Sequence, residues 1–358
     1  MTEHTFAPRP GYEHVVAYRA DRPAVEVDLS DNTNQWGAPP SALAALRAVD
    51  PRHVSEYPPV DSRRLAEAIS AYVGVSPEST ISGCGSDDLL DASMRALAQP
   101  GDRVAHPAPT FAMIPVLARA NGLVPVPVPV LANGDVDADA MLATGARIMY
   151  LCTPNNPTGT AHSRRAVDHV IARAPGVVIV DEAYAEFADD IYTPTLPSHA
   201  HVFGTRTLSK SFGLAGLRVG YGVGAPALVN EVLKARGPYK VNAFAEAAAT
   251  AALTHDAEWM RRVAGEVREL RPRFATALAE IGLKALPSHA NFLCVPVANA
   301  PPLVERLYAR GIAVRGLRGL PVIGDVLRIG LAPWPVLERV RDALRDALTD
   351  QKRSQVPA

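Results

Sequence analysis

The stretch TRTLSKSFGLAGLRVGYGVG, from Thr205 to Gly224, decides how the chain is interpreted. It holds one lysine, Lys210, among serine, glycine and small apolar residues, and Arg218 follows eight positions later. A lone lysine is usually a solvated surface charge. Lys210, however, follows the apolar run HVFGTRTLS and precedes FGLAGL, where nothing long or polar shields it. A desolvated lysine has a lowered pKa and becomes a nucleophilic amine that suits Schiff-base chemistry.

The chain around this stretch alternates between two patterns. Short apolar runs such as RIMYLC and GVVIVDEAY are separated by helical stretches such as DLLDASMRALAQ and RRAVDHVIARA. This alternation predicts an α/β fold with a mostly parallel central sheet covered by helices. We expect an N-terminal arm over 1–38 that packs with a small domain, a large domain over 39–255, a smaller α+β domain over 256–348, and a disordered tail over 349–358.

Composition excludes several classes of protein. The 358 residues carry a formal net charge of −1, so no electrostatic argument favours nucleic acid or an anionic membrane. No long apolar run predicts a membrane span, and the first residues lack the pattern of a secretory signal. The three cysteines are isolated, which argues against a disulfide framework and against a CxxC metal site. We expect a cytoplasmic protein without a metal.

Three further places resemble strand ends, where ligands bind in open α/β sheets. In SGCGSDDLL, two glycines allow a tight turn and Ser86 is a good N-cap, so the free amides of the next helix would suit a phosphate. An ordinary glycine turn is the alternative. The third glycine of the GxGxxG dinucleotide motif is absent, which disfavours a nicotinamide dehydrogenase.

The other two strand ends carry polar side chains. Asn156 forms a turn in CTPNNPTG, and a turn without a ligand is the alternative. Asp181 ends the apolar strand VVIVD, where a buried carboxylate needs a cationic partner or a solvated cleft; a helix cap is the alternative. Tyr184 follows in the same turn. Together with Lys210 and a phosphate cradle containing Arg218, these are the parts that pyridoxal 5′-phosphate (PLP) requires.

Nearly the whole chain, from about Tyr18 to the last helix, resembles the fold-type I PLP-dependent aminotransferases of class I/II. Within them it is most similar to the histidinol-phosphate aminotransferase branch. The motifs that carry the resemblance are RTLSKSFGLAGLRVGY, PNNPTG, VDEAYAEF and GCGSDD. The resemblance implies a ping-pong transfer between a small-molecule amino donor, such as histidinol phosphate, and a 2-oxo acid acceptor, such as 2-oxoglutarate.

The resemblance also implies roles for single residues. Lys210 would form the imine with PLP and move the proton, and Asp181 would pair with the ring nitrogen. Asn156 and Tyr184 would hydrogen-bond the ring 3′-oxygen. The residues that would hold the phosphate or stack on the ring are Gly85, Ser86, Asp87, Thr207, Ser209, Arg218 and Phe111. Tyr57 would reach the phosphate of a neighbouring subunit, which implies a homodimer.

Substrate residues follow from the same resemblance. Arg328 would bind a substrate carboxylate through a bidentate fork. Arg315 and Tyr18 would bind a phosphate or a second carboxylate of the substrate. The alternative is that Arg315 is an ordinary surface arginine and Tyr18 an ordinary buried tyrosine of the arm. Asn34 belongs to the arm segment DNTNQWGAPP. In the family this segment forms part of the substrate pocket and usually reads NENPYGPSP, so this chain departs from the family at several positions there. Lys240 is a second departure, and it either favours an acidic substrate or faces solvent.

Two enzymes and one regulator compete with this interpretation. An aminotransferase for aromatic or other amino acids has the same motifs, and so does a phosphothreonine-type PLP decarboxylase. The choice of reaction depends on which Cα bond stands perpendicular to the cofactor ring, so the sequence separates these poorly. A PLP-bound regulator needs a DNA-binding domain, for which the arm before Pro39 leaves no room.

Overall fold

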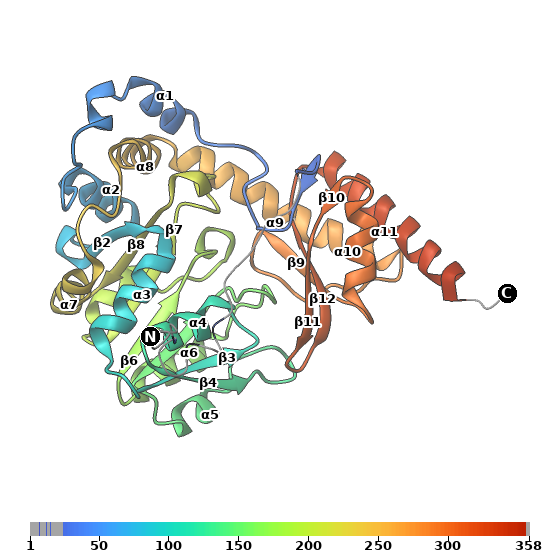
Figure 1. The fold of residues 1–358 in the computed structure, drawn as a ribbon, viewed down its shortest axis with the longest axis horizontal. Helices are drawn as coiled ribbons and strands as arrows, with labels where there is room; N and C mark the ends of the chain where they lie inside the picture. The colour runs from blue at the N-terminus through green and yellow to red at the C-terminus, as the bar shows by residue number, and fades with distance from the viewer. Residues whose placement is uncertain (1–6, 8–11, 13–14, 16–23, 356–358) are drawn as a thin grey trace, which may run out of the picture.

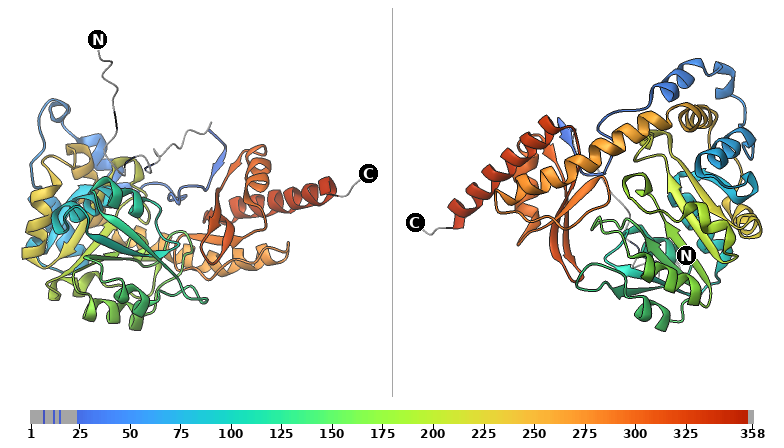
Figure 2. Two further views of the ribbon diagram at one scale, coloured as in Figure 1. Left: turned by 60° about the horizontal axis from the view of Figure 1, so that its bottom comes forward. Right: turned by 180° about the vertical axis from the view of Figure 1, so that it is seen from behind.

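The computed structural model describes residues 24–355 together with residues 7, 12 and 15. Figure 1 shows a large lobe and a smaller C-terminal lobe, and a long helix, α9 (Ala257–Ala279), runs from one to the other. The views in Figure 2 show the last helix, α11 (Trp334–Gln355), leading away from the large lobe. Tyr18 lies outside the described residues. None of the described helices combines the length and the apolar character that a membrane crossing requires.

The large lobe is built on a seven-stranded sheet in the order β2-β8-β7-β6-β5-β3-β4. Its strands are β2 (Thr80–Cys84), β3 (Arg103–Ala108), β4 (Val124–Pro129), β5 (Ile148–Cys152), β6 (Val177–Asp181), β7 (Val202–Thr207) and β8 (Val219–Gly224). β8 runs antiparallel to both of its neighbours, and the other neighbouring strands pair in parallel. The predicted α/β fold with a mostly parallel sheet is confirmed.

Both faces of this sheet are buried, and alternate residues of each strand serve opposite faces. In β5, Met149 and Leu151 join one core cluster, while Ile148 and Tyr150 join the other. Helices α3, α4 and α7 contribute to the second cluster, and α2, α6 and α8 contribute to the first. This explains why the strands are continuously apolar in sequence rather than alternating.

The helices of the large lobe are mostly short and amphipathic. They are α1 (Pro40–Ala48), α2 (Arg63–Val73), α3 (Gly85–Leu97), α4 (Met113–Ala120), α5 (Ala138–Ala143), α6 (Arg164–Arg173), α7 (Pro226–Arg236) and α8 (Ala243–His255). Short 3-10 turns are η2 (Pro51–Val54), η3 (Pro77–Ser79), η4 (Ala185–Phe187), η5 (Thr193–Ser198) and η6 (Ala215–Leu217). Side chains of Ser62, Asp137, Ser163 and Asn242 cap α2, α5, α6 and α8.

The C-terminal lobe combines a small antiparallel sheet with helices. The sheet has the order β11-β12-β9, formed by β9 (Phe292–Pro296), β11 (Arg315–Leu320) and β12 (Gly324–Gly330). Helix α10 (Ala300–Tyr308) and the strand β10 (Ile312–Ala313) complete it. The arm joins this lobe, because β1 (Val27–Asp28) pairs in parallel with β10. This pairing attaches the arm to the C-terminal lobe.

The last helix differs from the sequence-based expectation. We expected disorder over 349–358, but α11 continues to Gln355. The segment from Trp334 to Gln355 contains no glycine, and after Pro335 in the first turn the next proline is Pro357. Because nothing in this segment interrupts helical hydrogen bonding, the helix runs on past residue 348.

Candidate active site

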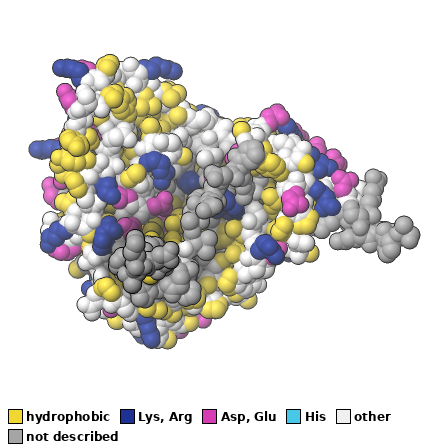
Figure 3. Space-filling view, in the orientation of Figure 1, with side chains coloured by type: hydrophobic (Ala, Val, Ile, Leu, Met, Phe, Trp, Pro, Cys, Tyr) yellow, Lys and Arg dark blue, Asp and Glu magenta, His cyan; other side chains and the backbone are white. Residues whose placement is uncertain are grey.

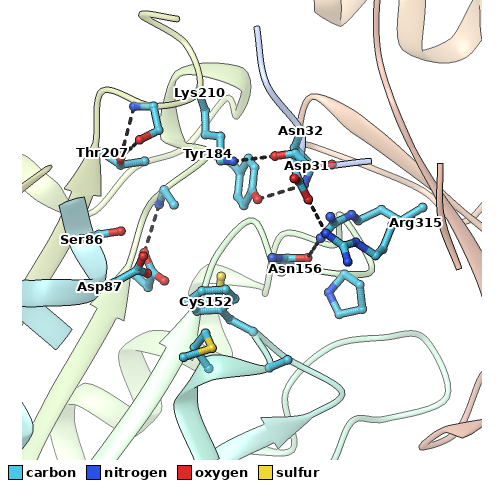
Figure 4. A pocket seen from close by; sticks show the side chains of 18 of the residues that line it. Asp31, Asn32, Ser86, Asp87, Cys152, Asn156, Tyr184, Thr207, Lys210 and Arg315 are labelled. Atoms are coloured by element: carbon cyan, nitrogen blue, oxygen red, sulfur yellow. Dashed lines mark hydrogen bonds and ion pairs between the residues drawn. The ribbon is translucent and has the colours of Figure 1, made fainter. Parts of the chain in front are cut away.

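A cavity of about 480 Å³ opens at the carboxyl ends of β5, β6 and β7, where the arm and the C-terminal lobe meet the large lobe. Its wall combines side chains from the large lobe with Asp31, Asn32 and Thr33 of the arm and with Arg315 and Arg328 of the C-terminal lobe. Figure 4 shows these side chains converging from different elements. On the face seen in Figure 3, charged side chains of both signs are scattered rather than gathered into one patch.

Lys210 lies in the loop that follows β7, and its amine enters this cavity. Nζ donates a hydrogen bond of 2.8 Å to the backbone carbonyl oxygen of Asp31. Burial, reinforced by the nearby positive charge of Arg328, lowers the pKa of Lys210 to about 8. The amine therefore exchanges its proton near neutral pH, as a nucleophile or a general base must.

Asp181 is the last residue of β6, and only 3% of its surface is exposed. Its carboxylate accepts hydrogen bonds from the Tyr150 hydroxyl at 2.7 Å, the Thr205 hydroxyl at 3.1 Å and the Ala183 amide at 3.2 Å. Burial raises the pKa of Asp181 to about 6. Among the described residues no lysine, arginine or histidine forms an ion pair with it, so the side that faces the cavity suits a cationic ligand.

Tyr184 and Asn156 lie on the same wall. The Tyr184 hydroxyl accepts a hydrogen bond of 3.1 Å from Asn32 Nδ2, and burial raises the pKa of Tyr184 to about 12. Oδ1 of Asn156 accepts a hydrogen bond of 2.6 Å from Arg328 Nη1. A phenol that stays protonated and a fixed amide together suit a phenolate oxygen on a ligand ring.

An anion cradle lies at the start of α3, beside the end of β7. Arg218 Nη1 lies 3.4 Å from the Ser209 hydroxyl, and the Thr207 hydroxyl donates to Ser209 Oγ at 2.9 Å. Arg218 Nη2 also lies 3.4 Å from the Asp87 carboxylate. Free amides at a helix start together with a guanidinium favour a phosphate. Ser86 lines the cavity.

The predicted cap of α3 is wrong in detail. The helix begins at Gly85, so Cys84 occupies the N-cap position and Ser86 lies inside the first turn. Gly85 has a φ of +79°, a conformation that a serine at this position would adopt only under strain. The turn that leads into α3 therefore requires glycine at position 85. The helix begins at this glycine, one residue before Ser86, so Ser86 cannot be its N-cap.

Gly220 of β8 allows the cradle to lie this close to the sheet. A Cβ on Gly220 would lie 2.3 Å from the Ser86 amide nitrogen and 2.4 Å from the Gly85 carbonyl carbon. Such contacts are impossible without moving the backbone of α3. The glycine in VGYGVG thus positions the amides at the start of α3.

Two arginines of the C-terminal lobe reach the opposite side of the cavity. Arg328 is 8% exposed; its Nη2 donates a hydrogen bond of 2.6 Å to the carbonyl oxygen of Ser30. Arg315 forms an ion pair with Asp31. Both arginines line the cavity, and their binding of substrate groups stays a prediction.

The remaining predicted residues divide into two groups. Phe111 lines the cavity. Asn34 does not, because its Nδ2 donates to the Ser211 carbonyl oxygen at 2.9 Å and its Oδ1 accepts from the Trp36 amide at 2.8 Å. Tyr57 is 82% exposed and stacks on Tyr239, with ring centroids 4.6 Å apart, so it does not enter the cavity of its own chain.

Lys240 and Trp36, a residue of the arm segment DNTNQWGAPP, depart from the family pattern, and both form polar contacts with other side chains. Lys240 pairs with Asp88 at 2.8 Å, close to the start of α3. The indole nitrogen of Trp36 donates a hydrogen bond of 2.6 Å to Glu266 on α9. Neither side chain lines the cavity. Trp36 therefore attaches the arm to α9, the helix that joins the two lobes.

Sequence reasoning missed several residues of this site, among them Asp31, Asn32, Tyr150 and Thr205. Asp31 and Asn32 line the cavity from an arm segment without periodicity, and their contacts join residues more than 150 positions apart. Tyr150 and Thr205 hold Asp181 from inside apolar strands, where they resemble ordinary core residues. One signal was present: a buried carboxylate at a strand end requires donors, and neighbouring strands supply them.

Comparisons with known proteins agree with this geometry. The family model for aminotransferase class I and II matches residues 25–344. A histidinol-phosphate aminotransferase from Roseiflexus castenholzii is 39% identical over 90% of this chain and 89% of its own, and one from Ruegeria pomeroyi is 34% identical over 95% and 97%.

A solved structure agrees as well. The histidinol-phosphate aminotransferase from Sinorhizobium meliloti, in complex with pyridoxal 5′-phosphate, has a TM-score of 0.83 at 27% identity and covers 91% of this chain and 92% of its own. The predicted resemblance is confirmed, and with it the prediction of an enzyme. The chain belongs to the family of class I and II aminotransferases.

Proposed function

We propose that this aminotransferase uses PLP to take the amino group of histidinol phosphate and pass it to 2-oxoglutarate. Support for the donor comes from relatives named histidinol-phosphate aminotransferases at 39% and 34% identity. The observation that carries the proposal is that the Lys210 amine and the buried carboxylate of Asp181 line the same cavity. The pKa of Lys210 is lowered to about 8 and that of Asp181 is raised to about 6. At pH 7 to 8 a fraction of the amine is therefore neutral while the carboxylate is ionised.

The described residues fit PLP. Asp181 has no cationic partner among them, and a protonated ring nitrogen would supply one. A Cβ on Gly85 would lie 2.7 Å from Arg218 Nη2, so this glycine lets the start of α3 lie against the guanidinium, and the two together suit a phosphate. Phe111 lines the space where a ring would lie. When bound, PLP supplies an aldehyde that condenses with amines and a ring that accepts electron density from the donor carbon.

The chain's own residues then hold the donor and move the proton. Arg328 would bind the anionic group of the donor, because its guanidinium is already oriented by Asn156 and the Ser30 carbonyl oxygen. Lys210 Nζ would accept the proton that leaves the donor's α-carbon and return it during the second half of the exchange. Tyr184 would hydrogen-bond the ring oxygen while its raised pKa keeps it protonated.

A substrate assay tests the proposal. PLP-loaded enzyme is mixed with 2-oxoglutarate and either histidinol phosphate or phenylalanine, and glutamate and carbon dioxide are both measured. We expect glutamate with histidinol phosphate, and no carbon dioxide from phenylalanine, which is the one donor of the two that carries a carboxylate a decarboxylase could release. Activity with phenylalanine but not histidinol phosphate would overturn the donor and keep the aminotransferase, while release of carbon dioxide would overturn transamination itself.

We propose a homodimer as the active unit, with Tyr57 reaching the neighbouring site. Support comes from the exposed hydrophobic side chains of Val54, Tyr57, Val60 and Tyr239, of which Tyr57 and Tyr239 stack on each other, because exposed apolar surface marks interaction sites. Light scattering tests the dimer: we expect twice the 38.1 kDa of one chain, and a monomer that is fully active would contradict it.

We also propose a cytoplasmic location, because three cysteines without disulfides suit a reducing compartment.

A further inference from the structure

Asp31 occupies an unusual position between the two halves of the cavity. Its backbone carbonyl oxygen accepts the hydrogen bond from Lys210 Nζ, and its carboxylate forms the ion pair with Arg315 (Figure 4). One residue of the arm thus contacts both the amine of the large lobe and a substrate-facing arginine of the C-terminal lobe. Neither the family motifs nor the apolar patterning pointed to it.

The backbone on both sides of Asp31 is fixed. The Ser30 carbonyl oxygen accepts from Arg328, and the Asn32 carbonyl oxygen accepts from Asn291 Nδ2 at 3.0 Å. Asn32 has a φ of +55°, which sets the direction of the peptide group that carries the Asp31 carbonyl. Because the main chain is held at these points, the position of the Asp31 side chain beside Arg315 follows from the fold of the arm.

The ion pair itself is built so that one partner can leave. The side chain of Asp31 is 53% exposed, while that of Arg315 is 17% exposed. The carboxylate can therefore turn into water at small cost, whereas the guanidinium stays in the cavity wall. Arg328 donates hydrogen bonds to the oxygens of Asn156 and Ser30.

We propose that Asp31 is a specificity-determining residue that serves as a built-in counter-anion for Arg315, so that an anionic group of a substrate binds Arg315 only by displacing this carboxylate. A monocarboxylate then exchanges one carboxylate for another and gains little. A phosphate dianion brings more charge and more acceptor oxygens, so it gains affinity from the exchange. The Asp31 carboxylate lowers the affinity of Arg315 for both kinds of anion, so a phosphate monoester, which binds a guanidinium more strongly, still occupies Arg315 at concentrations at which a monocarboxylate does not.

This inference deepens the proposed function and rests on it for the place of Arg315 in the substrate site. Inorganic phosphate is the ligand for the test, and its binding to the PLP-loaded enzyme is measured by calorimetry without turnover. Loading with PLP fills the cradle at α3, so the phosphate added is not counted there. The variant is Asp31→Asn, which keeps the backbone carbonyl and the shape of the side chain but removes its charge.

We expect Asp31→Asn to bind phosphate about fivefold more tightly, since the competing ion pair is a partly exposed one. The control is Glu26→Gln, which removes another arm carboxylate that pairs with Arg339 outside the cavity wall, and it should bind phosphate as the unsubstituted enzyme does. The double variant Asp31→Asn, Arg315→Gln should lose the gain.

Two results would overturn the inference: phosphate affinity that is unchanged or weaker in Asp31→Asn, or a gain that persists in the double variant. Failure of the proposed donor is distinguishable. If the calorimetry follows the expected pattern but histidinol phosphate is not a substrate, Arg315 selects another phosphate monoester, and only the donor assignment falls.

Discussion

The hydroxyl of Tyr150 donates a hydrogen bond of 2.7 Å to Asp181 on the neighbouring strand of the central sheet. Burial raises the pKa of Asp181 to about 6, and this hydrogen bond is the largest effect that opposes the rise. Tyr150 therefore helps to keep the carboxylate charged at neutral pH. A hydroxyl buried in an apolar strand thus acts on the site through its neighbour.

Replacing Tyr150 with phenylalanine tests this relationship. The pKa of Asp181 should rise further, so PLP affinity at pH 7 should fall about tenfold. The carboxylate is charged only above its pKa. Affinity should therefore fall as pH drops through about 6 in the unsubstituted enzyme, and from a higher pH in the variant. PLP titrations across pH measure both effects.

A matched control is Tyr192→Phe, whose hydroxyl is buried without a hydrogen-bond partner among the described residues. It should bind PLP with the pH dependence of the unsubstituted enzyme. An unchanged pH dependence in Tyr150→Phe would show that the hydrogen bond does not set the charge of Asp181.

The lowered pKa of Lys210 predicts a pH dependence for cofactor incorporation. Only the neutral amine attacks an aldehyde, so the rate of PLP incorporation should rise with pH through about 8 and then level off. Stopped-flow absorbance measures this rate. Lys234→Ala is the control, because Lys234 pairs with Glu231 on α7 and does not line the cavity. A midpoint near the ordinary lysine value of 10.5 would contradict the buried environment of Lys210.

Arg328→Lys tests the substrate fork. A lysine provides a point charge and cannot donate through two parallel N–H groups, so we expect the KM for the amino donor to rise about thirtyfold. Steady-state kinetics measures it. Arg339→Lys is the matched control, because Arg339 is partly exposed and pairs with Glu26 outside the cavity. Equal KM values in the two variants would remove Arg328 from the substrate site.

The contact between Gly220 and the start of α3 predicts a large effect from one methyl group. Gly220→Ala should lower the free energy of unfolding by about 1–3 kcal/mol, because the backbone of α3 must shift, and should also weaken PLP binding. Chemical denaturation and PLP titration measure the two effects. Gly216→Ala is the control, since its Cβ would meet nothing within 4 Å. Equal stability of the two variants would contradict the described packing.

The parts of the site that sequence could predict lie at strand ends. Lys210, Asp181 and Asn156 each follow an apolar run, and in a parallel sheet the carboxyl ends of neighbouring strands meet at one edge. The strand order that brings β5, β6 and β7 together also brings these residues together. Hence short local patterns were enough to place them.

The parts that sequence could not predict depend on long-range packing. Asp31 reaches the cavity only because β1 pairs with β10 and carries the arm across the lobe boundary. Tyr150 resembles any buried aromatic until its neighbour on β6 is known. Ser86 failed as a cap because the tight turn required a positive φ at Gly85. Each of these features depends on a long-range contact or on a backbone angle, and neither can be recognised from a local sequence pattern.

The central claim is that the Lys210 amine is the group that binds PLP covalently. The measurement is borohydride reduction of the PLP-saturated enzyme, followed by digestion and mass spectrometry of the peptides. We predict a pyridoxyl group on the peptide that contains Lys210, and none on that peptide in Lys210→Ala, which should still bind PLP without turnover. A saturated enzyme that yields no modified Lys210 peptide, or a Lys210→Ala variant with normal turnover, would contradict the account.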